Sequence, residues 1–580
     1  MSLKKTFFLF VALGVLFIAF YTLTHAKHES YPLGIATPNP LATQAGYAML
    51  QQGGSVMDAV IAAQMVLTLV EPQSSGMGGG AFLMLNENDK ILMFDGRETA
   101  PLAATPDLFM RDGMPLSFHE AGVGGRAVGV PGILKMLKLA HDQYGRLPWA
   151  DLFVPAIQLA EQGFAISPRL AMMIADDPFL FNQHVTRNYF YHPDGSPKQV
   201  GEILTNPDLA QTLRSIAKEG IAAFYSGPIA EDMINTVQQH TDNPGILALS
   251  DLAHYTPKIR EPLCSIYLQW RICGASPPSS GGITVGQILG ILSSVQTAPL
   301  YAQTDQGLNF SSETIHLFSE AGKLAYADRD YYIADPDFIA APGNNWQNLL
   351  NPNYLAARSL LISSQSMGTA QPGRPEDYPF MLGMNNQIER PSTAHIAIAD
   401  EWGQVLSMTT SVADVFGSRL MVRGFLLNNQ LTDFSFSPID QNGLPIANSV
   451  AAGKRPRSSM SPTIVFDLEN NRPIISVGSA GGPNIINYVA KTLMSTLVGG
   501  STLQTAMNLP NMGSRNGPIE LEEGRFSSSI IQELQARGHT VEEIPLKSGL
   551  QGLFRPDPEQ LFWQGANDPR REGTSIVDRF

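Results

Sequence analysis

Hydrophobic residues recur at helical spacing near the start of the chain and again through its middle. Asn39-Pro40 opens one such segment, Gly53-Gly54 closes it, and Ser55 precedes an apolar segment that runs to Val70. A capping side chain, a proline in the first turn and a glycine after the last turn are typical of helix ends. The same periodicity predicts further helices over residues 132–142, 150–162, 207–218, 228–240 and 313–328.

Strand-like segments lie mainly at the two ends of the chain. Residues 81–86 and 90–94 predict a hairpin, and residues 393–400 and 404–411 predict two strands around a Glu401-Trp402-Gly403 turn. Residues 364–391 are polar and contain proline and glycine, which predicts a linker. A helix-rich middle combined with a strand-rich C-terminal third favours an α+β fold in which helices cover sheets.

The first 26 residues have the pattern of a targeting segment. Lys4 and Lys5 precede an apolar run over residues 7–23, and small residues, Thr24 and Ala26, stand three positions and one position before a candidate cleavage site. The run is consistent with a cleaved signal peptide and with an uncleaved membrane anchor. In both cases we expect the rest of the chain to be exported to the periplasm or another extracytoplasmic compartment.

Export affects the interpretation of the two cysteines. A two-residue turn at Leu268-Gln269 would place Cys264 opposite Cys273 in a hairpin. Directly opposed cysteines can form a disulfide in an oxidising compartment. The alternative is a pair of unbridged strand cysteines.

Composition narrows the functional classes. Of the 580 residues, 44% are hydrophobic and 16% are charged, which favours a folded core over disorder. The excess of 52 acidic over 38 basic residues gives a net charge of −14 and argues against a nucleic-acid partner. The eleven histidines have no metal-ligand spacing, and no phosphate-binding loop is present. We therefore expect no metal and no cofactor.

Small residues cluster at three places, namely Gly76 to Gly80, Ser458-Ser459 and Gly478 to Gly482. Glycine lets backbone N–H groups approach a ligand, where they can stabilise a developing oxyanion. Each cluster alone is typical of a tight turn. A functional interpretation needs further residues.

Those residues come from an ordered set of motifs that includes Pro391-Ser392-Thr393-Ala394-His395. The set resembles the γ-glutamyltranspeptidase family of N-terminal-nucleophile hydrolases over residues 30–580. The matching segments are Glu71-Pro72, Ser75-Gly76-Met77-Gly78-Gly79-Gly80, Asp95-Gly96-Arg97-Glu98, Gly129-Val130-Pro131-Gly132, Pro277-Pro278-Ser279-Ser280-Gly281-Gly282, Ala325-Tyr326-Ala327-Asp328-Arg329, Leu427-Asn428-Asn429-Gln430, Asp433-Phe434, Ser458-Ser459-Met460 and Gly481-Gly482.

The resemblance implies a four-layer αββα sandwich built from two fragments of one self-cleaved precursor. The cut would fall between Ser392 and Thr393, giving a large subunit (27–392) and a small subunit (393–580). The freed α-amine of Thr393, with an ordinary pKa of roughly 7.7–8.0, could take the proton from the Thr393 hydroxyl. We expect His395 to be structural.

The resemblance also implies the substrate and the roles of the site residues. The donor would be glutathione or a related γ-glutamyl compound, and the acyl group would pass through Thr393 to water, an amino acid or a peptide. Arg97, Ser458 and Ser459 would bind the donor α-carboxylate, Gln430 and Asp433 its α-ammonium, Gly481 and Gly482 the oxyanion, and Ser411 would orient the nucleophile.

The chain departs from the family pattern near this site. Ala413 replaces an asparagine that contacts the donor α-amino group, Thr432 replaces the first acid of an Asp-Asp-Phe motif, and Ser411 replaces a threonine. On a strand, Asp414 would point away from the donor. Losing one buried hydrogen bond to a charged group costs roughly 1.5–3 kcal/mol. Residues 434–457 are long enough for a lid, with a disordered surface loop as the alternative.

Two other functions stay open. One is a related amidase, such as a glutaryl-cephalosporin acylase or a poly-γ-glutamate hydrolase. Ala413 favours it because a donor without an ammonium group needs no acceptor there, whereas the retained Asp433 argues against it. The other is a relative that binds γ-glutamyl compounds with little or no turnover.

Overall fold

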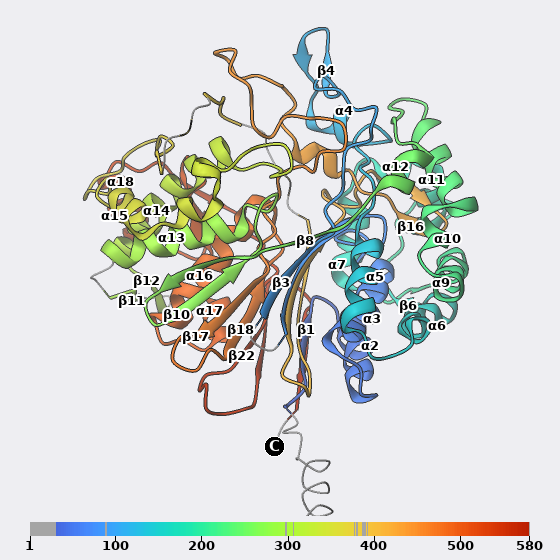
Figure 1. The fold of residues 1–580 in the computed structure, drawn as a ribbon, viewed down its shortest axis with the longest axis horizontal. Coiled ribbons are helices and arrows are strands. Elements are labelled where there is room, and N and C mark those ends of the chain that lie inside the picture. Colours follow the sequence, from blue (N-terminus) through green and yellow to red (C-terminus); the bar gives the residue numbers. More distant parts are fainter. Residues whose placement is uncertain are drawn as a thin grey trace, which may run out of the picture.

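A computed structural model describes residues 31–87, 90–295, 299–304, 307–375, 378, 381–385, 390 and 392–578. The targeting segment (1–26) lies outside the described residues, as do parts of 364–391. Two antiparallel sheets form the centre of the molecule, and helices cover the outer face of each (Figure 1).

The first sheet has seven strands and combines both ends of the chain. Its central pair is β13 and β14, the predicted strands at 393–411, and β1 joins them on one side. The strand order is β24 (Thr574–Val577), β1 (Gly34–Thr37), β13 (Ala394–Ala399), β14 (Val405–Ser411), β2 (Gly80–Glu87), β3 (Lys90–Asp95) and β8 (Lys258–Arg260).

The second sheet has six strands. Four come from the C-terminal part of the chain, and the pair β10 and β9 completes one edge. The order is β23 (Gln564–Asn567), β22 (Gln551–Phe554), β18 (Pro473–Gly478), β17 (Thr463–Asp467), β10 (Trp270–Gly274) and β9 (Leu263–Tyr267).

The two sheets pack face to face. Because side chains alternate along a strand, one face of each sheet contributes to a shared apolar layer. Phe82 and Met84 of β2 pack there with Ile464 and Phe466 of β17 and with Leu553 of β22. This layer fixes β13 and β14 against the second sheet.

Helices α2 (Pro40–Gln51) and α3 (Val56–Val70) cover the outer face of the seven-stranded sheet, as predicted for these segments. Every residue of α3 is buried, which its almost continuous apolar sequence allows. Helices α13 (Gly281–Val295), α14 (Ser312–Tyr332) and α16 (Ile485–Leu497) form the apolar core on the outer side of the six-stranded sheet.

The other predicted helices form close to their predicted bounds. They are α5 (Ile133–Tyr144), α6 (Val154–Gln162), α9 (Pro207–Glu219) and α11 (Gly227–Gln238). The remaining helices are α4 (Phe118–Gly122), α7 (Pro168–Asp176), α8 (His184–Phe190), α10 (Ala222–Tyr225), α12 (Leu249–His254), α15 (Pro352–Ser359), α17 (Leu503–Asn508) and α18 (Ser528–Ala536). Short strands are β4 (Met110–Arg111), β5 (Met114–Pro115), β6 (Phe164–Ala165), β7 (Ile203–Leu204), β11 (Tyr301–Thr304), β12 (Gly307–Phe310), β15 (Met421–Val422), β16 (Phe425–Leu426), β19 (Met512–Gly513), β20 (Ile519–Glu522) and β21 (Val541–Ile544).

The cysteine hairpin has the predicted register. Tyr267 pairs with Trp270, and Cys264 pairs with Cys273. The structure joins the two cysteines in a disulfide across β9 and β10, at the edge of the second sheet.

The first part of the linker predicted over 364–391, residues 364–375, forms no helix or strand but is hydrogen-bonded to the rest of the protein. The Ala370 N–H donates to Asn516 Oδ1 at 2.7 Å, and the Gly373 N–H donates to Asp328 Oδ1 at 2.7 Å. Residues 364–375 therefore follow the surface of the helices outside the six-stranded sheet.

None of the helices in the described part of the chain combines the length and the apolar character that a membrane span requires.

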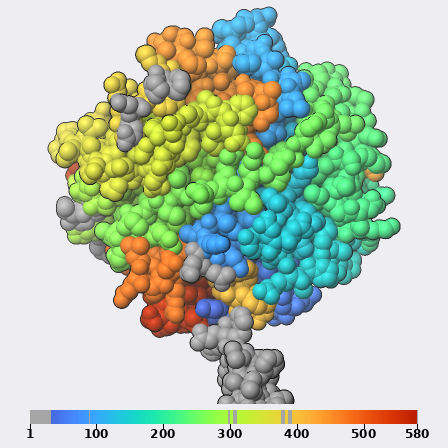
Figure 2. All heavy atoms as spheres, in the orientation of Figure 1, coloured from blue at the N-terminus to red at the C-terminus, as the bar shows by residue number. Residues whose placement is uncertain are grey.

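Residues 434–457 pack beside α4. The sequence predicts a lid for this segment, with a disordered surface loop as the alternative. The rings of Phe109 and Phe436 stack with centroids 4.6 Å apart, and Phe434 and Val450 join the same apolar cluster. Figure 2 shows this part of the chain, in orange, against the light-blue segment around residue 110. The packing excludes the disordered alternative, and a lid function stays a prediction.

Candidate active site

Thr393 immediately precedes β13, beside the end of β14. Its hydroxyl donates to Ser411 Oγ at 3.3 Å, and Ser411 Oγ also accepts the Ala413 N–H at 2.9 Å. The register of the two strands, with Ala394 opposite Thr410, brings the hydroxyls together. Both residues are buried. Ser411 is thus held so that it can orient the Thr393 hydroxyl.

The peptide bond before Thr393 is held by neighbours on both sides. The Ser392 carbonyl accepts the Gly481 N–H at 3.3 Å, and the Ser392 hydroxyl donates to the Gln73 carbonyl at 2.8 Å. Thr393 has a φ of 109°. For a β-branched residue this is an unfavourable backbone conformation, which costs about 1–3 kcal/mol. The surrounding contacts therefore hold this bond under strain.

Gly481 and Gly482 join β18 to α16 through a short turn. Their φ values are 131° and 61°, a region that favours glycine. A Cβ on Gly481 would lie 2.5 Å from the Tyr488 ring. Both the conformation and the close approach require glycine, and together they place the Gly481 N–H on the Ser392 carbonyl.

Arg97 lies just after β3 and is fully buried. Its Nη2 contacts Asp433 Oδ2 at 2.5 Å and donates to the Arg457 carbonyl at 2.9 Å. Gln430 Nε2 donates to the same Asp433 oxygen at 2.6 Å. The predicted carboxylate and ammonium binders therefore face each other as an ion pair, which compensates both buried charges.

Glu98 lies next to this pair. Burial raises the pKa of its carboxyl to about 8, against the opposing effect of the Arg97 charge. Near neutral pH Glu98 is therefore mainly uncharged, although its Oε2 lies 3.8 Å from Arg97 Nη1.

Ser458 and Ser459 reach the site from a loop between residues 434–457 and β17. Ser458 Oγ accepts the Met460 N–H at 3.1 Å. Ser459 Oγ accepts from Arg329 Nη2 of α14 at 2.6 Å. These contacts fix the two hydroxyls at the pocket wall.

One small pocket collects nearly all the residues that the sequence predicted for the site. The predicted residues that line it are Arg97, Thr393, Ser411, Gln430, Asp433, Ser458, Ser459 and Gly482, together with Arg390, Ala413, Met460 and Ile485. Gly481 lies beside it on the Ser392 carbonyl. Cys264 and Cys273 do not line this pocket and belong to the edge hairpin.

Comparison with known proteins agrees with this arrangement. The family model described as Gamma-glutamyltranspeptidase matches residues 42–577. The chain belongs to this family. This match confirms the family resemblance that the motifs indicated. Because the family consists of enzymes, it also confirms the prediction that the protein is an enzyme.

Individual relatives cover almost the whole chain. A glutathione hydrolase proenzyme of Bacillus subtilis is 35% identical over 93% of this chain and 91% of its own length. An acylase ACY 1 proenzyme of a Pseudomonas species is 30% identical, covering 94% and 93%. Among solved structures, the cephalosporin acylase from Bacillus halodurans has a TM-score of 0.80 at 28% identity, covering 94% of this chain and 96% of that one.

At the positions where the chain departs from the family pattern, the described residues provide no replacement acceptor. Ala413 lines the pocket with a φ of 80°. Asp414 instead pairs with Arg419 at 2.7 Å, and Arg419 also contacts Asp177 at 2.8 Å. The Thr432 hydroxyl donates to the Asn429 carbonyl at 2.9 Å. Of the predicted ammonium binders, Gln430 and Asp433 line the pocket.

His395 is part of the packing between the sheets. Its ring lies against Gly478, where an added Cβ would come within 2.4 Å of it, and its Nδ1 lies 2.9 Å from Thr409 Oγ1. Burial lowers the pKa of His395 to about 3, so the ring is neutral. These contacts agree with the structural role expected for it.

Two arginines near Thr393 were missed by the sequence analysis. Arg390 lines the pocket, and Arg571 Nη1 donates to the Thr393 carbonyl at 3.0 Å. Arg390 stands three residues before Thr393, so a scan for charges beside the predicted cleavage site could have found it. Arg571 is 178 residues away in the sequence and carries no local signal.

A possible metal-ligand group lies elsewhere. His316, Glu320 and His539 are close together and buried. His316 Nδ1 and His539 Nε2 are 2.7 Å apart, and the Glu320 oxygens accept from Lys323 at 2.9 Å and from the Met367 N–H at 2.9 Å. None of the three residues lines the Thr393 pocket. These hydrogen bonds engage His316 Nδ1, His539 Nε2 and both Glu320 oxygens, whereas His539 Nδ1 is buried without a hydrogen-bond partner. The three residues form a buried polar network away from the Thr393 pocket.

Proposed function

We propose that the protein is an exported γ-glutamyl hydrolase and transferase that acts on glutathione and related compounds after cutting itself between Ser392 and Thr393. The observation that carries this proposal is the convergence of Thr393, Ser411, Arg97 and Asp433 on one pocket. Relatives named glutathione hydrolase proenzyme, 35% identical for Bacillus subtilis, support the substrate.

Self-cleavage needs an attack on the Ser392 carbonyl carbon by the Thr393 hydroxyl. The Gly481 N–H already contacts the carbonyl oxygen and would stabilise its negative charge. The C–N bond then breaks, and the acyl group moves from nitrogen to oxygen as an ester. Water hydrolyses the ester, which leaves a Ser392 carboxylate and a free Thr393 amine. The strained φ of Thr393 favours the reaction because cleavage relieves it.

The same hydroxyl would then attack the donor γ-carbonyl. The α-amine of Thr393 accepts the proton, and Gly481 and Gly482 hold the oxyanion. The leaving amine takes a proton as the γ-glutamyl ester forms. Water or the amine of an amino acid or peptide attacks that ester, releasing glutamate or a new γ-glutamyl amide and restoring the Thr393 hydroxyl.

The Arg97–Asp433 pair suits the α-amino-acid end of such a donor. A zwitterion offers a carboxylate to the Arg97 guanidinium and an ammonium to Asp433 and Gln430. Ser458 and Ser459 add hydroxyls on the carboxylate side. The donor thus replaces one ion pair by two without leaving a buried charge unpaired.

The proposal includes the fold and processing implied by the family. The two sheets and their outer helices would be the four-layer αββα sandwich of N-terminal-nucleophile hydrolases. Residues 27–392 would form the large subunit and 393–580 the small subunit. Residues 1–26 would direct export as a signal peptide or as an anchor that holds the enzyme to a membrane.

Intact-mass and N-terminal sequencing of the purified protein test this proposal. We expect two fragments, the smaller beginning Thr-Ala-His-Ile, and release of glutamate from glutathione. Thr393→Ala should give one uncut chain without activity, whereas Thr393→Ser should keep both processes. Two fragments from Thr393→Ala, or fully cut wild type that leaves glutathione intact, would contradict the proposal.

Ala413 favours a second candidate, an amidase whose donor lacks the ammonium group. The structural similarity to a cephalosporin acylase supports it, and the retained Asp433 argues against it. Turnover of γ-glutamyl and glutaryl anilides separates the two. If the γ-glutamyl donor is preferred, Ala413→Asn should lower its KM about tenfold or more by restoring one hydrogen bond to a charged group. Faster turnover of the glutaryl anilide would favour the amidase.

A further inference from the structure

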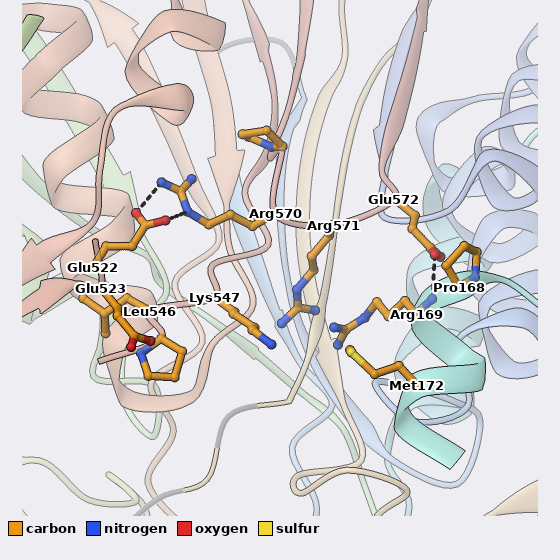
Figure 3. A pocket seen from close by; sticks show the side chains of 12 residues that line it. Pro168, Arg169, Met172, Glu522, Glu523, Leu546, Lys547, Arg570, Arg571 and Glu572 are labelled. Atoms are coloured by element: carbon orange, nitrogen blue, oxygen red, sulfur yellow. Dashed lines mark hydrogen bonds and ion pairs between the residues drawn. The ribbon is translucent and has the colours of Figure 1, made fainter. Parts of the chain in front are cut away.

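A second cavity, of about 580 Å³, shares no lining residue with the Thr393 pocket. It lies between the start of α7, residues 545–547 and residues 569–572. Figure 3 shows Arg169, Lys547 and Arg571 entering it from these three segments, with their charged groups pointing toward one another. Three cations converging on one cavity repel each other unless an anion lies between them.

The acidic residues of the cavity have other partners or lie at its edge. Glu522 forms a two-point pair with Arg570, with contacts of 2.5 and 2.8 Å, so this arginine is already neutralised. Glu572 accepts the backbone N–H of Arg169 at 2.8 Å. Glu523 is exposed beside the 545–547 segment. Arg169, Lys547 and Arg571 therefore keep an excess of positive charge.

Glu71 is a buried acid beside Arg169, and both Glu71 and the buried Asp568 interact electrostatically with Arg571. Glu71 Oε2 lies 3.8 Å from Arg169 Nε and accepts hydrogen bonds from Gln73 and Ser74. Burial raises the pKa of Glu71 and weakens it as a counter-charge. Within the described part of the chain, the Nε atoms of Arg169 and Arg571 are buried without a hydrogen-bond acceptor. Such donors are ordinarily satisfied, so the two Nε atoms require an acceptor. Glu71 Oε1 and Glu572 Oε2 are also buried without a hydrogen-bond partner.

The cavity is connected to the nucleophile through one side chain. Arg571 extends from the cavity to the Thr393 carbonyl, which it contacts at 3.0 Å. Desolvation, with the nearby charge of Arg169, lowers the pKa of Arg571 to about 9. An anion in the cavity would stabilise the charged guanidinium and keep it on that carbonyl.

We propose that Arg169, Lys547 and Arg571 form a binding site for a small, multiply charged oxyanion, and that the bound anion fixes Thr393 through Arg571. Inorganic phosphate and a tricarboxylate share the required chemistry. The binding itself is independent of the proposed function, whereas the effect on Thr393 rests on it. Arg571 is therefore a positioning residue, not a catalytic one.

Calorimetric titration of the purified full chain with phosphate, and separately with citrate, tests the site at constant ionic strength in chloride buffer. We expect saturable binding with one site per chain. The dissociation constants of phosphate and citrate show which of the two anions the site prefers. Arg169→Gln and Lys547→Gln should each weaken binding about tenfold, the value of one charge-assisted hydrogen bond. Lys218→Gln, at an exposed lysine of α9, is the matched control and should bind like wild type. Equal affinity of wild type and the Arg169→Gln/Lys547→Gln double variant, with unchanged melting temperatures, would overturn the site.

The link to Thr393 has its own measurement. The anion that binds should change kcat for a γ-glutamyl anilide in wild type and leave kcat of the double variant unchanged, with KM little affected in both. Arg571→Lys should respond to the anion more weakly than wild type. Binding without any change in kcat would overturn the link to Thr393. Absence of γ-glutamyl turnover would instead count against the proposed function, because the titrations do not depend on activity.

Discussion

At the scale of single residues, the candidate site consists largely of hydroxyl and amide groups. Contacts with the backbone hold these groups in position. Ser411 shows this clearly. Its Oγ accepts the Ala413 N–H at 2.9 Å and the Thr393 hydroxyl at 3.3 Å. The rotamer of Thr393, the proposed nucleophile, is therefore fixed by a contact with the end of β14.

Substitution of Ser411 measures this dependence. We expect Ser411→Ala to lower kcat about ten- to hundredfold, with little change in KM, because one hydrogen bond to the nucleophile is lost. Ser411→Thr should restore activity, since threonine keeps the hydroxyl and suits a strand. Steady-state kinetics on a γ-glutamyl anilide gives both values. Equal kcat for Ser411→Ala and wild type would show that Thr393 needs no such partner.

The candidate site residues could be named from sequence because the family motifs are short and ordered. Arg97 and Asp433 each matched a motif, but their mutual contact at 2.5 Å joins segments 336 residues apart in the sequence. No local pattern carries such a pairing. The contact of Arg571 with the Thr393 carbonyl escaped prediction for the same reason.

At the scale of elements, the sequence predicted well what depends on local chemistry. The bounds of α3 and α9 follow the caps at Ser55 and Asn206 and lie within a few residues of the expected segments. The order of strands in the sheets could not be predicted from the sequence, because antiparallel pairing between distant segments has no local signature. Residues 364–375 form no helix or strand, as expected of a linker. The backbone N–H groups of Gly373 and Ala370 nevertheless donate to Asp328 of α14 and to Asn516, and no local pattern predicts these contacts.

The edge hairpin of β9 and β10 gives a prediction about stability. The disulfide closes a short loop, with a separation of 9 residues, and such a cross-link stabilises by about 2–3 kcal/mol in the chain-entropy model. Cys264→Ser/Cys273→Ser should therefore melt a few degrees lower than wild type. A thiol reductant should lower the melting temperature of wild type and leave that of the variant unchanged. Identical melting in all four conditions would mean that the bridge contributes nothing.

His395 on β13 predicts a pH dependence of stability. Its pKa is about 3 in the folded protein, against an ordinary value of 6.5, so the unfolded chain binds the extra proton first as pH falls. Stability should thus be lost between these two values on acidification, by up to about 1.4 kcal/mol per pH unit.

Urea titrations across this pH range check the expectation. His395→Gln should have a shallower pH dependence than wild type, although it is less stable at neutral pH because it lies between tightly packed sheets. His254→Gln, at an exposed histidine of α12, serves as the control and should keep the wild-type slope. The same slope for His395→Gln and wild type would contradict the burial argument.

At the scale of the whole molecule, the cut proposed before Thr393 divides both sheets between two fragments. β1 lies between β24 and β13, and β14 pairs with β2. In the second sheet, β10 pairs with β17 across the same division. Each fragment therefore contributes strands to both sheets.

This interleaving predicts how the processed protein behaves. Size-exclusion chromatography and native mass spectrometry should show one particle containing both fragments, whereas a denaturing gel shows two bands. The fragments should separate only when the protein unfolds, in one cooperative transition. Elution of folded, separate fragments would contradict this expectation.

The position of β1 between two strands of the other fragment also bears on biogenesis. β1 (residues 34–37) would have no strand partner in a large fragment made alone, and β13 would lack one of its two strand partners in a small fragment made alone. Two separately synthesised pieces would thus expose unpaired strand edges and aggregate before they met. A single uninterrupted chain keeps these strand partners together while it folds. We therefore expect a gene split at codon 393 to yield little assembled protein.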